Sequence, residues 1–134
     1  MGKQKEFISD FANWTKGQTD VLGAFLVGSY ARNSEKDGSD IDFVIITSNT
    51  QSLLDNQDWV NQFGTVAKIQ KENYGLVQSL RVFYQDGIEA EFGITTPEWI
   101  KLPIDPGTQK VLLDGYKILF EKDNLLFNLI KNLP

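Results

Sequence analysis

The sequence contains no cysteine and no histidine. Without cysteine it forms no disulfide and offers no thiolate nucleophile, and without histidine it builds no Ser-His-Asp or Cys-His catalytic site. The usual structural zinc sites need the same two residue types and are excluded as well. Carboxylates are therefore the main chemical resource of this chain, and we expect any reaction that it catalyses to depend on a metal ion.

Long apolar runs and an excess of positive charge are also missing. Residues 1–6 hold no apolar run of signal-peptide length, and no segment approaches the roughly 20 apolar residues of a membrane span, so we expect a cytoplasmic protein without membrane contact. The formal net charge of −5 disfavours a polymerase or any general binding of long nucleic acids. A length of 134 residues with 41% hydrophobic content predicts a single domain over residues 1–134.

Helical and strand patterns alternate along the chain without a repeat or a linker. Apolar spacing predicts helices over 3–16 and 51–63 and strands over 21–27, 41–47, 66–70, 80–84 and 88–95. Further patterns predict a short helix capped by Thr96, a helix over 105–113, an edge strand over 116–120 and a closing helix over 125–133. The helical spacing of Phe7, Phe11 and Trp14 favours core packing over a platform for base stacking. The alternation is typical of a compact α/β sandwich.

A Gly-Ser turn and a pair of aspartates stand at the ends of two predicted strands. Gly28 and Ser29 follow the strand 21–27, where the chain turns into a short helix whose backbone N–H groups suit an anion. Asp40 and Asp42 open the next strand and share one of its faces, while their apolar neighbours face the core. Magnesium binds through one or two carboxylates plus substrate phosphates, so this pairing predicts a site for a nucleoside triphosphate with Mg²⁺.

The spacing of these residues between apolar strands resembles the signature of the DNA polymerase beta-like nucleotidyltransferase superfamily, in its minimal and antibiotic-modifying branches. The resemblance implies an α+β (α/β) nucleotidyltransferase fold with a mixed central sheet and flanking helices. It also implies that the turn at Ser29 holds the triphosphate and that Asp40 and Asp42 bind magnesium. An isolated Asp-x-Asp is most often a solvated turn, so the interpretation depends on the conjunction of turn, spacing and strands.

In that superfamily a third acidic residue on a later strand completes the site. Glu91 lies between two apolar residues after a predicted hairpin turn at Asp86 and Gly87, at the offset where antibiotic-modifying relatives carry an Asp. Glu89 shares its face and is the alternative third ligand. Alternating glutamates are also typical of the solvent-facing side of a strand.

Other residues near the turn each have two alternative interpretations. Arg32 stands one short-helix turn after Ser29, where its guanidinium meets either phosphate oxygens or a local carboxylate. Ser39 either binds phosphate or shapes the entry to the strand, and Lys36 is by default a solvated charge. For Tyr30, packing beside the loop is favoured over stacking on a base.

The resemblance implies transfer of a nucleoside monophosphate, by default AMP from ATP, to an acceptor hydroxyl at a site of two Mg²⁺ ions held by Asp40, Asp42 and Glu91. The acceptor is open among an antibiotic hydroxyl, a protein side chain and an RNA end. The 134 residues hold no long helical C-terminal domain of the kind found in antibiotic adenylyltransferases, which favours a minimal enzyme whose acceptor binds on a small surface, at a homodimer interface or on a partner chain. The alternative function is an antitoxin-like or nucleotide-binding regulatory partner of a separate helical protein, with little or no turnover.

Overall fold

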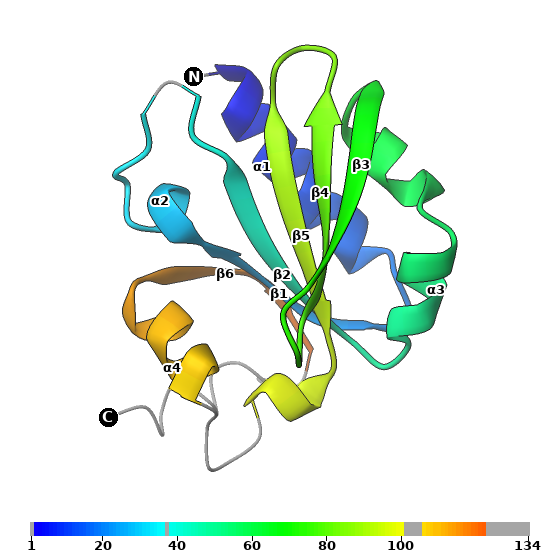
Figure 1. Ribbon diagram of the computed structural model, residues 1–134, viewed down its shortest axis with the longest axis vertical. Coiled ribbons are helices and arrows are strands. Elements are labelled where there is room, and N and C mark those ends of the chain that lie inside the picture. Colours follow the sequence, from blue (N-terminus) through cyan, green and yellow to red (C-terminus); the bar gives the residue numbers. More distant parts are fainter. Residues whose placement is uncertain (1, 37, 101–105, 123–134) are drawn as a thin grey trace.

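A computed structural model describes residues 2–36, 38–100 and 106–122 of the chain. Six strands form one mixed sheet in the order β3-β4-β5-β2-β1-β6, in which β2 and β5 run parallel and the other neighbouring strands antiparallel (Figure 1). The fold is the predicted α+β class, with a mixed sheet and flanking helices. The elements in chain order are α1 (Gly2–Lys16), β1 (Val21–Val27), α2 (Gly28–Ala31), β2 (Ile41–Thr47), α3 (Thr50–Asp55), η1 (Asp58–Phe63), β3 (Val66–Asn73), β4 (Gln78–Tyr84), β5 (Glu89–Thr95), η2 (Pro97–Ile100), α4 (Pro106–Leu113) and β6 (Tyr116–Glu121).

One face of the sheet, which we call the aromatic face, carries the larger core. Phe43 of β2 and Phe92 of β5 stack with ring centroids 5.4 Å apart, and Phe11 of α1 lies 4.1 Å from the ring of Phe43. Trp14 of α1 stacks on Trp59 of η1 at 4.8 Å. The helices α1, α3 and η1 bury this face, which confirms that the apolar stripe of α1 packs in the core.

The opposite face, which we call the acidic face, carries a smaller apolar cluster and the candidate carboxylates. Side chains alternate along a strand, so Asp42 and Val44 lie on this face while Phe43 between them lies on the other. Trp99 of η2 and Leu112 of α4 pack against the apolar residues of β1 and β2. The acidic residues therefore share a face with this second cluster and are separated from the main core by the thickness of the sheet.

The predicted helix over 51–63 is wrong as one element, because α3 ends at Asp55 and the 3₁₀ helix η1 begins at Asp58. Asn56 has extended backbone angles, and its side chain accepts a hydrogen bond from the Asp58 N–H at 3.1 Å. Asparagine competes with helical hydrogen bonding in this way and so ends the helix. The break also lets the Trp59 indole N–H donate to the Leu53 carbonyl oxygen at 3.0 Å.

The strand predicted over 66–70 is longer, since β3 continues to Asn73 and β4 starts already at Gln78. The two strands form a hairpin, in which the Asn73 side chain accepts a hydrogen bond from the Gly75 N–H at 2.9 Å and Gly75 adopts a φ of +79°. An asparagine side chain that accepts from the backbone N–H two residues on, here a glycine at positive φ, is ordinary turn chemistry, and it was not predicted from the sequence. The extension brings Glu72 and Tyr74 near the acidic face.

The predicted elements after residue 95 are partly described. The hydroxyl of Thr96 accepts the Glu98 N–H at 3.3 Å, as its capping role predicted, and β6 is an edge strand. In the predicted helix over 105–113 the described residues 106–113 form α4, and the predicted helix over 125–133 lies outside the described residues. No helix within the described ranges combines the length and the apolar character needed to cross a lipid bilayer.

Candidate active site

The turn after β1 lies directly against a carboxylate. Gly28 has a φ of +72°, a conformation that glycine adopts readily, and a Cβ atom at this position would collide with the carboxylate of Asp42. Val27 precedes α2 and provides no side-chain cap for its first N–H groups. Ser29 follows and is half-buried. The turn and the second aspartate are therefore adjacent in space, as the sequence spacing predicted.

Three carboxylates converge on the acidic face. Asp42 of β2 is the register partner of Glu91 of β5 in the parallel strand pair. Together with Asp40, each of these residues offers one carboxylate oxygen within 4.8 Å of the other two. Hard oxygen donors are the ligands that Mg²⁺, Mn²⁺ and Ca²⁺ take in proteins, so the donor set fits a divalent cation. Among the described residues Glu89 is not part of this group, although it lies two residues upstream on the same face.

Burial and the charges of neighbouring carboxylates disfavour the ionised forms of Asp42 and Glu91. Partial burial, followed by the charges of Asp40 and Glu91, raises the pKa of Asp42 from 3.8 to about 7. Burial likewise raises the pKa of Glu91, against the opposing effect of Arg81. Carboxylates that share a site in this way are stabilised by a proton or by a cation. The electrostatics therefore favour a positively charged ligand at this point.

Arg81, the basic residue among these carboxylates, was not among the predicted site residues. It lies on β4 as the register partner of Glu91. Its guanidinium forms salt bridges with Glu72 at 2.6 Å, Glu89 at 2.7 Å, Glu91 at 2.6 Å and Asp40 at 3.1 Å. The third-ligand candidates Glu89 and Glu91 thus both bind the same arginine.

The hairpin between β4 and β5 contains the signal that would have revealed this contact. Its turn closes with the Tyr84 N–H donating to the Ile88 carbonyl at 2.8 Å, and Gly87 has a φ of +94°. A three-residue loop that ends in a glycine at positive φ fixes the pairing of the two strands. Counting back from that turn places Arg81 directly opposite Glu91.

The remaining predicted residues lie around the turn. Arg32 is exposed, its stem lies against Gly115, and no salt bridge joins it to a carboxylate in the described part of the chain. The Ser39 hydroxyl accepts the Lys36 N–H at 2.9 Å, which shapes the entry to β2. Tyr30 is buried in the core, as the packing interpretation predicted.

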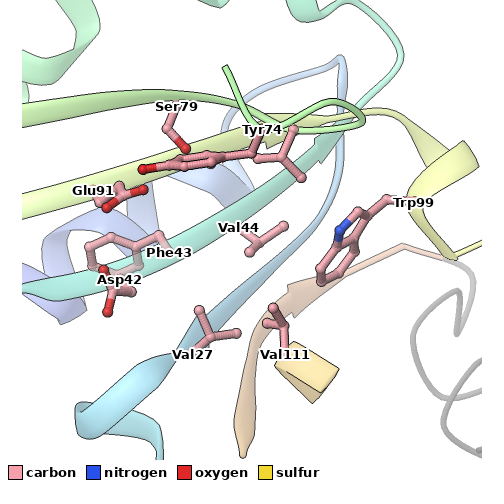
Figure 2. A pocket seen from close by; sticks show the side chains of 11 residues that line it. Val27, Asp42, Phe43, Val44, Tyr74, Ser79, Glu91, Trp99 and Val111 are labelled. Atoms are coloured by element: carbon pink, nitrogen blue, oxygen red, sulfur yellow. The ribbon is translucent and has the colours of Figure 1, made fainter. Parts of the chain in front are cut away.

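A pocket of about 220 Å³ begins at Asp42 and Glu91 and extends over apolar side chains to Trp99 and Val111 (Figure 2). Tyr74 from the β3–β4 hairpin lies along one side of it, and its hydroxyl donates to Glu72 at 2.6 Å. Apolar walls with a few charged groups at one end are typical of sites for small organic molecules. The sequence did not predict this pocket, because its walls come from elements that are far apart along the chain.

The comparisons with known proteins agree with this fold. The chain is similar in structure to an aminoglycoside 6-adenyltransferase from Bacillus subtilis, with a TM-score of 0.57 and 17% identity over 70% of this chain. It spans 35% of the length of that protein, and at this identity the likeness supports the fold alone. No curated protein matches the sequence. A model of the family described as streptomycin adenylyltransferase matches residues 1–132, so the chain belongs to that family, within the nucleotidyltransferase superfamily.

Proposed function

We propose that this chain is a Mg²⁺-dependent nucleotidyltransferase domain that moves AMP from ATP to an acceptor hydroxyl. The observation that supports it most is the convergence of carboxylate oxygens from Asp40, Asp42 and Glu91 within 4.8 Å of one another. This group lies against the Gly28 turn, in a chain that belongs to an adenylyltransferase family. Oxygen donors beside an anion-binding turn suit a triphosphate with its magnesium.

In this proposal the carboxylates hold the cation and the turn holds the phosphates. When bound, Mg²⁺ supplies neutralisation of phosphate charge and promotes ionisation of a nearby hydroxyl. The backbone N–H groups after Gly28 and the Ser29 hydroxyl donate to phosphate oxygens, and Arg32 and Ser39 offer further donors from the adjacent loop. The acceptor oxygen forms a bond to the α-phosphorus, the bond to the leaving oxygen breaks, and pyrophosphate departs.

Glu91 is our choice for the base that receives the proton of the acceptor hydroxyl. It is the register partner of Asp42, and its side chain is 17% exposed against 31% for Glu89. Burial raises its pKa, which makes a carboxylate a better proton acceptor near neutral pH. Glu89 stays the alternative, since both carboxylates bind Arg81.

We place a cationic sugar hydroxyl first among the acceptors. The family and the structural neighbour are both named for aminoglycoside-type substrates. The acidic face carries Glu72 and Glu89 in addition to the three carboxylates proposed for the cation, and this surplus of negative charge attracts amino groups. The apolar pocket beside Asp42 and Glu91 then receives an uncharged part of one of the substrates.

A transfer assay tests this proposal. The full chain is incubated with Mg²⁺ and each nucleoside triphosphate labelled at the α-phosphate, in the presence of streptomycin, other aminoglycosides, or neutral sugars as controls. We expect label to move from ATP to a cationic sugar with release of pyrophosphate, and we expect Asp42→Asn to abolish the transfer. Release of pyrophosphate with no acceptor labelled would contradict the acceptor class, and no release with any triphosphate would contradict the activity.

A further inference from the structure

Arg81 of β4 binds four carboxylates that come from three other segments of the acidic face. Its Nε donates to Glu72 of β3 at 2.6 Å, its Nη1 to Asp40 at 3.1 Å and to Glu89 at 2.7 Å, and its Nη2 to Glu91 at 2.6 Å. All salt bridges found among the described residues involve this one arginine. A planar guanidinium with donors on three nitrogens is suited to such multiple pairing, whereas an ammonium is not.

Two of the three carboxylates in the candidate cation site also bind Arg81. Asp40 binds the guanidinium through Oδ2 and Glu91 through Oε2. Together with Asp42, Glu72 and Glu89, they bring the number of carboxylates around this one positive charge to five. The guanidinium therefore neutralises part of the negative charge of the same carboxylates that a divalent ion would bind.

We infer that Arg81 is a built-in counter-cation that holds Asp40 and Glu91 together in the absence of a divalent ion and weakens the binding of that ion. The inference rests on the proposed function, because it takes these carboxylates as cation ligands. Like charge a few ångströms away opposes a divalent ion, even where water screens the interaction. Arg81 is thus a positioning residue that sets the affinity of the site for its cation.

The strand pairing decides whether the loss of Arg81 tightens or weakens Mg²⁺ binding. Loss of Arg81 removes a repelling charge, but it also removes a group that orders the ligands. Asp42 and Glu91 are register partners on hydrogen-bonded strands, and Asp40 directly precedes the first residue of β2, so the backbone keeps the three carboxylates near one another without the arginine. The charge effect is therefore the larger one, and we expect removal of the charge to tighten Mg²⁺ binding by roughly tenfold.

The test measures cation binding directly and does not require activity. Mg²⁺ and Mn²⁺ are titrated calorimetrically into the wild-type chain, Arg81→Gln, Arg81→Lys and Lys16→Gln. Lys16 is exposed at the end of α1, which covers the opposite face, so its variant controls for the loss of one positive charge far from the site. We expect about tenfold tighter binding in Arg81→Gln, and binding within about threefold of wild type in Arg81→Lys and Lys16→Gln.

Thermal melting provides a second readout. Without divalent ions Arg81→Gln should melt below wild type, and Mg²⁺ should raise its melting temperature by more than it raises that of wild type. Weaker Mg²⁺ binding in Arg81→Gln would overturn the inference and would show that the arginine organises the ligands. Tenfold tighter binding in Arg81→Lys would also overturn it, because that variant keeps the positive charge. If neither wild type nor Arg81→Gln bound Mg²⁺, the proposed function would fail together with the inference, whereas wild-type binding that Arg81→Gln leaves unchanged would overturn the inference alone.

Discussion

The two faces of the central sheet are built from the same strands but differ in role, because one packs the main core and the other carries the carboxylates. Phe43 pairs with Phe92 across β2 and β5, and the residues immediately before them, Asp42 and Glu91, pair in the same register. The rings stack on the aromatic face, while the carboxylates meet on the acidic face. The packing that stabilises the fold therefore also sets the spacing of the carboxylates.

The faces differ in what they contribute to stability. Phe11 and Phe92 are fully buried among other rings, and such burial stabilises the folded state. On the acidic face, by contrast, partial burial and repulsion raise the pKa of Asp42, so its ionised form destabilises the fold. The unfavourable charges of the acidic face thus lie on a sheet that the packing of the aromatic face stabilises.

The largest expected effect on stability is on the aromatic face. Phe11→Ala should lower the free energy of unfolding by about 3–5 kcal/mol, because it leaves a cavity among the rings of Phe43, Phe63 and Phe92. Urea denaturation measures the loss, with Leu113→Ala, an exposed position on α4, as the control expected to stay within about 0.5 kcal/mol. A loss below about 1 kcal/mol would mean that this face does not carry the stability of the fold.

On the acidic face the corresponding change should affect turnover and spare the fold. Glu91→Gln should lower kcat by about 100- to 1000-fold, because a general base acts mainly in the transition state, and it should change the KM for ATP little, because Asp40 and Asp42 remain to hold the Mg²⁺ of the triphosphate. Glu89→Gln, the matched variant two residues away, should cost less than about tenfold. Steady-state kinetics with the acceptor found in the transfer assay give both values. The reversed pattern would make Glu89 the base, and equal small effects would contradict the proposed chemistry.

The pH dependence of stability tests the raised pKa of Asp42 on the acidic face. A folded-state pKa of about 7 against 3.8 for the ordinary group means that the folded chain keeps the proton longer than the unfolded chain, so wild type loses stability as pH rises from about 4 to about 7. Asp42→Asn does not ionise, so its melting temperature relative to wild type should increase over that window when divalent ions are absent. Melting curves at pH 4.5 and pH 7.5 measure this difference. An equal difference at both pH values would show that the Asp42 carboxyl ionises normally in the fold.

The smallest effect concerns the pocket at the edge of the acidic face. Val111 lines the pocket and is partly exposed, so Val111→Trp should narrow the pocket without unfolding α4. We expect a several-fold rise in the KM of one substrate, with kcat at saturation and Mg²⁺ affinity unchanged. Leu113→Trp, on the same helix but outside the pocket lining, is the control. Equal behaviour of the two variants would mean that no substrate uses this pocket.

The parts of the site that follow from the sequence are those encoded by short spacing. Strand alternation predicts that Asp40 and Asp42 share a face, and the resemblance to the nucleotidyltransferase superfamily implies that the turn at Gly28, fewer than fifteen residues earlier, lies beside them. Glu91 was predicted from the resemblance, which implies a third acidic residue on a later strand, together with the hairpin turn that precedes it.

Arg81 and the pocket were not predicted because they depend on contacts between distant segments, whereas the break at Asn56 depends on a local hydrogen bond. Arg81 reaches Glu72 and Asp40 through strand pairings that no single segment encodes. The break at Asn56 was hidden because the apolar spacing continues across it, and one side-chain hydrogen bond decides the outcome. The pocket is a product of tertiary packing alone.

The most direct test of the account is the response of the melting temperature to Mg²⁺ and ATP in Asp40→Asn and Asp42→Asn. A ligand that binds only the folded state stabilises it in proportion to the logarithm of its concentration over Kd, so wild type should melt at a higher temperature with both ligands present. Both variants should fold and lose most of this shift, whereas Asp10→Asn, an exposed carboxylate on α1, should keep it. If Asp40→Asn and Asp42→Asn both retain the wild-type shift, these carboxylates are not metal ligands and the proposed active site is wrong.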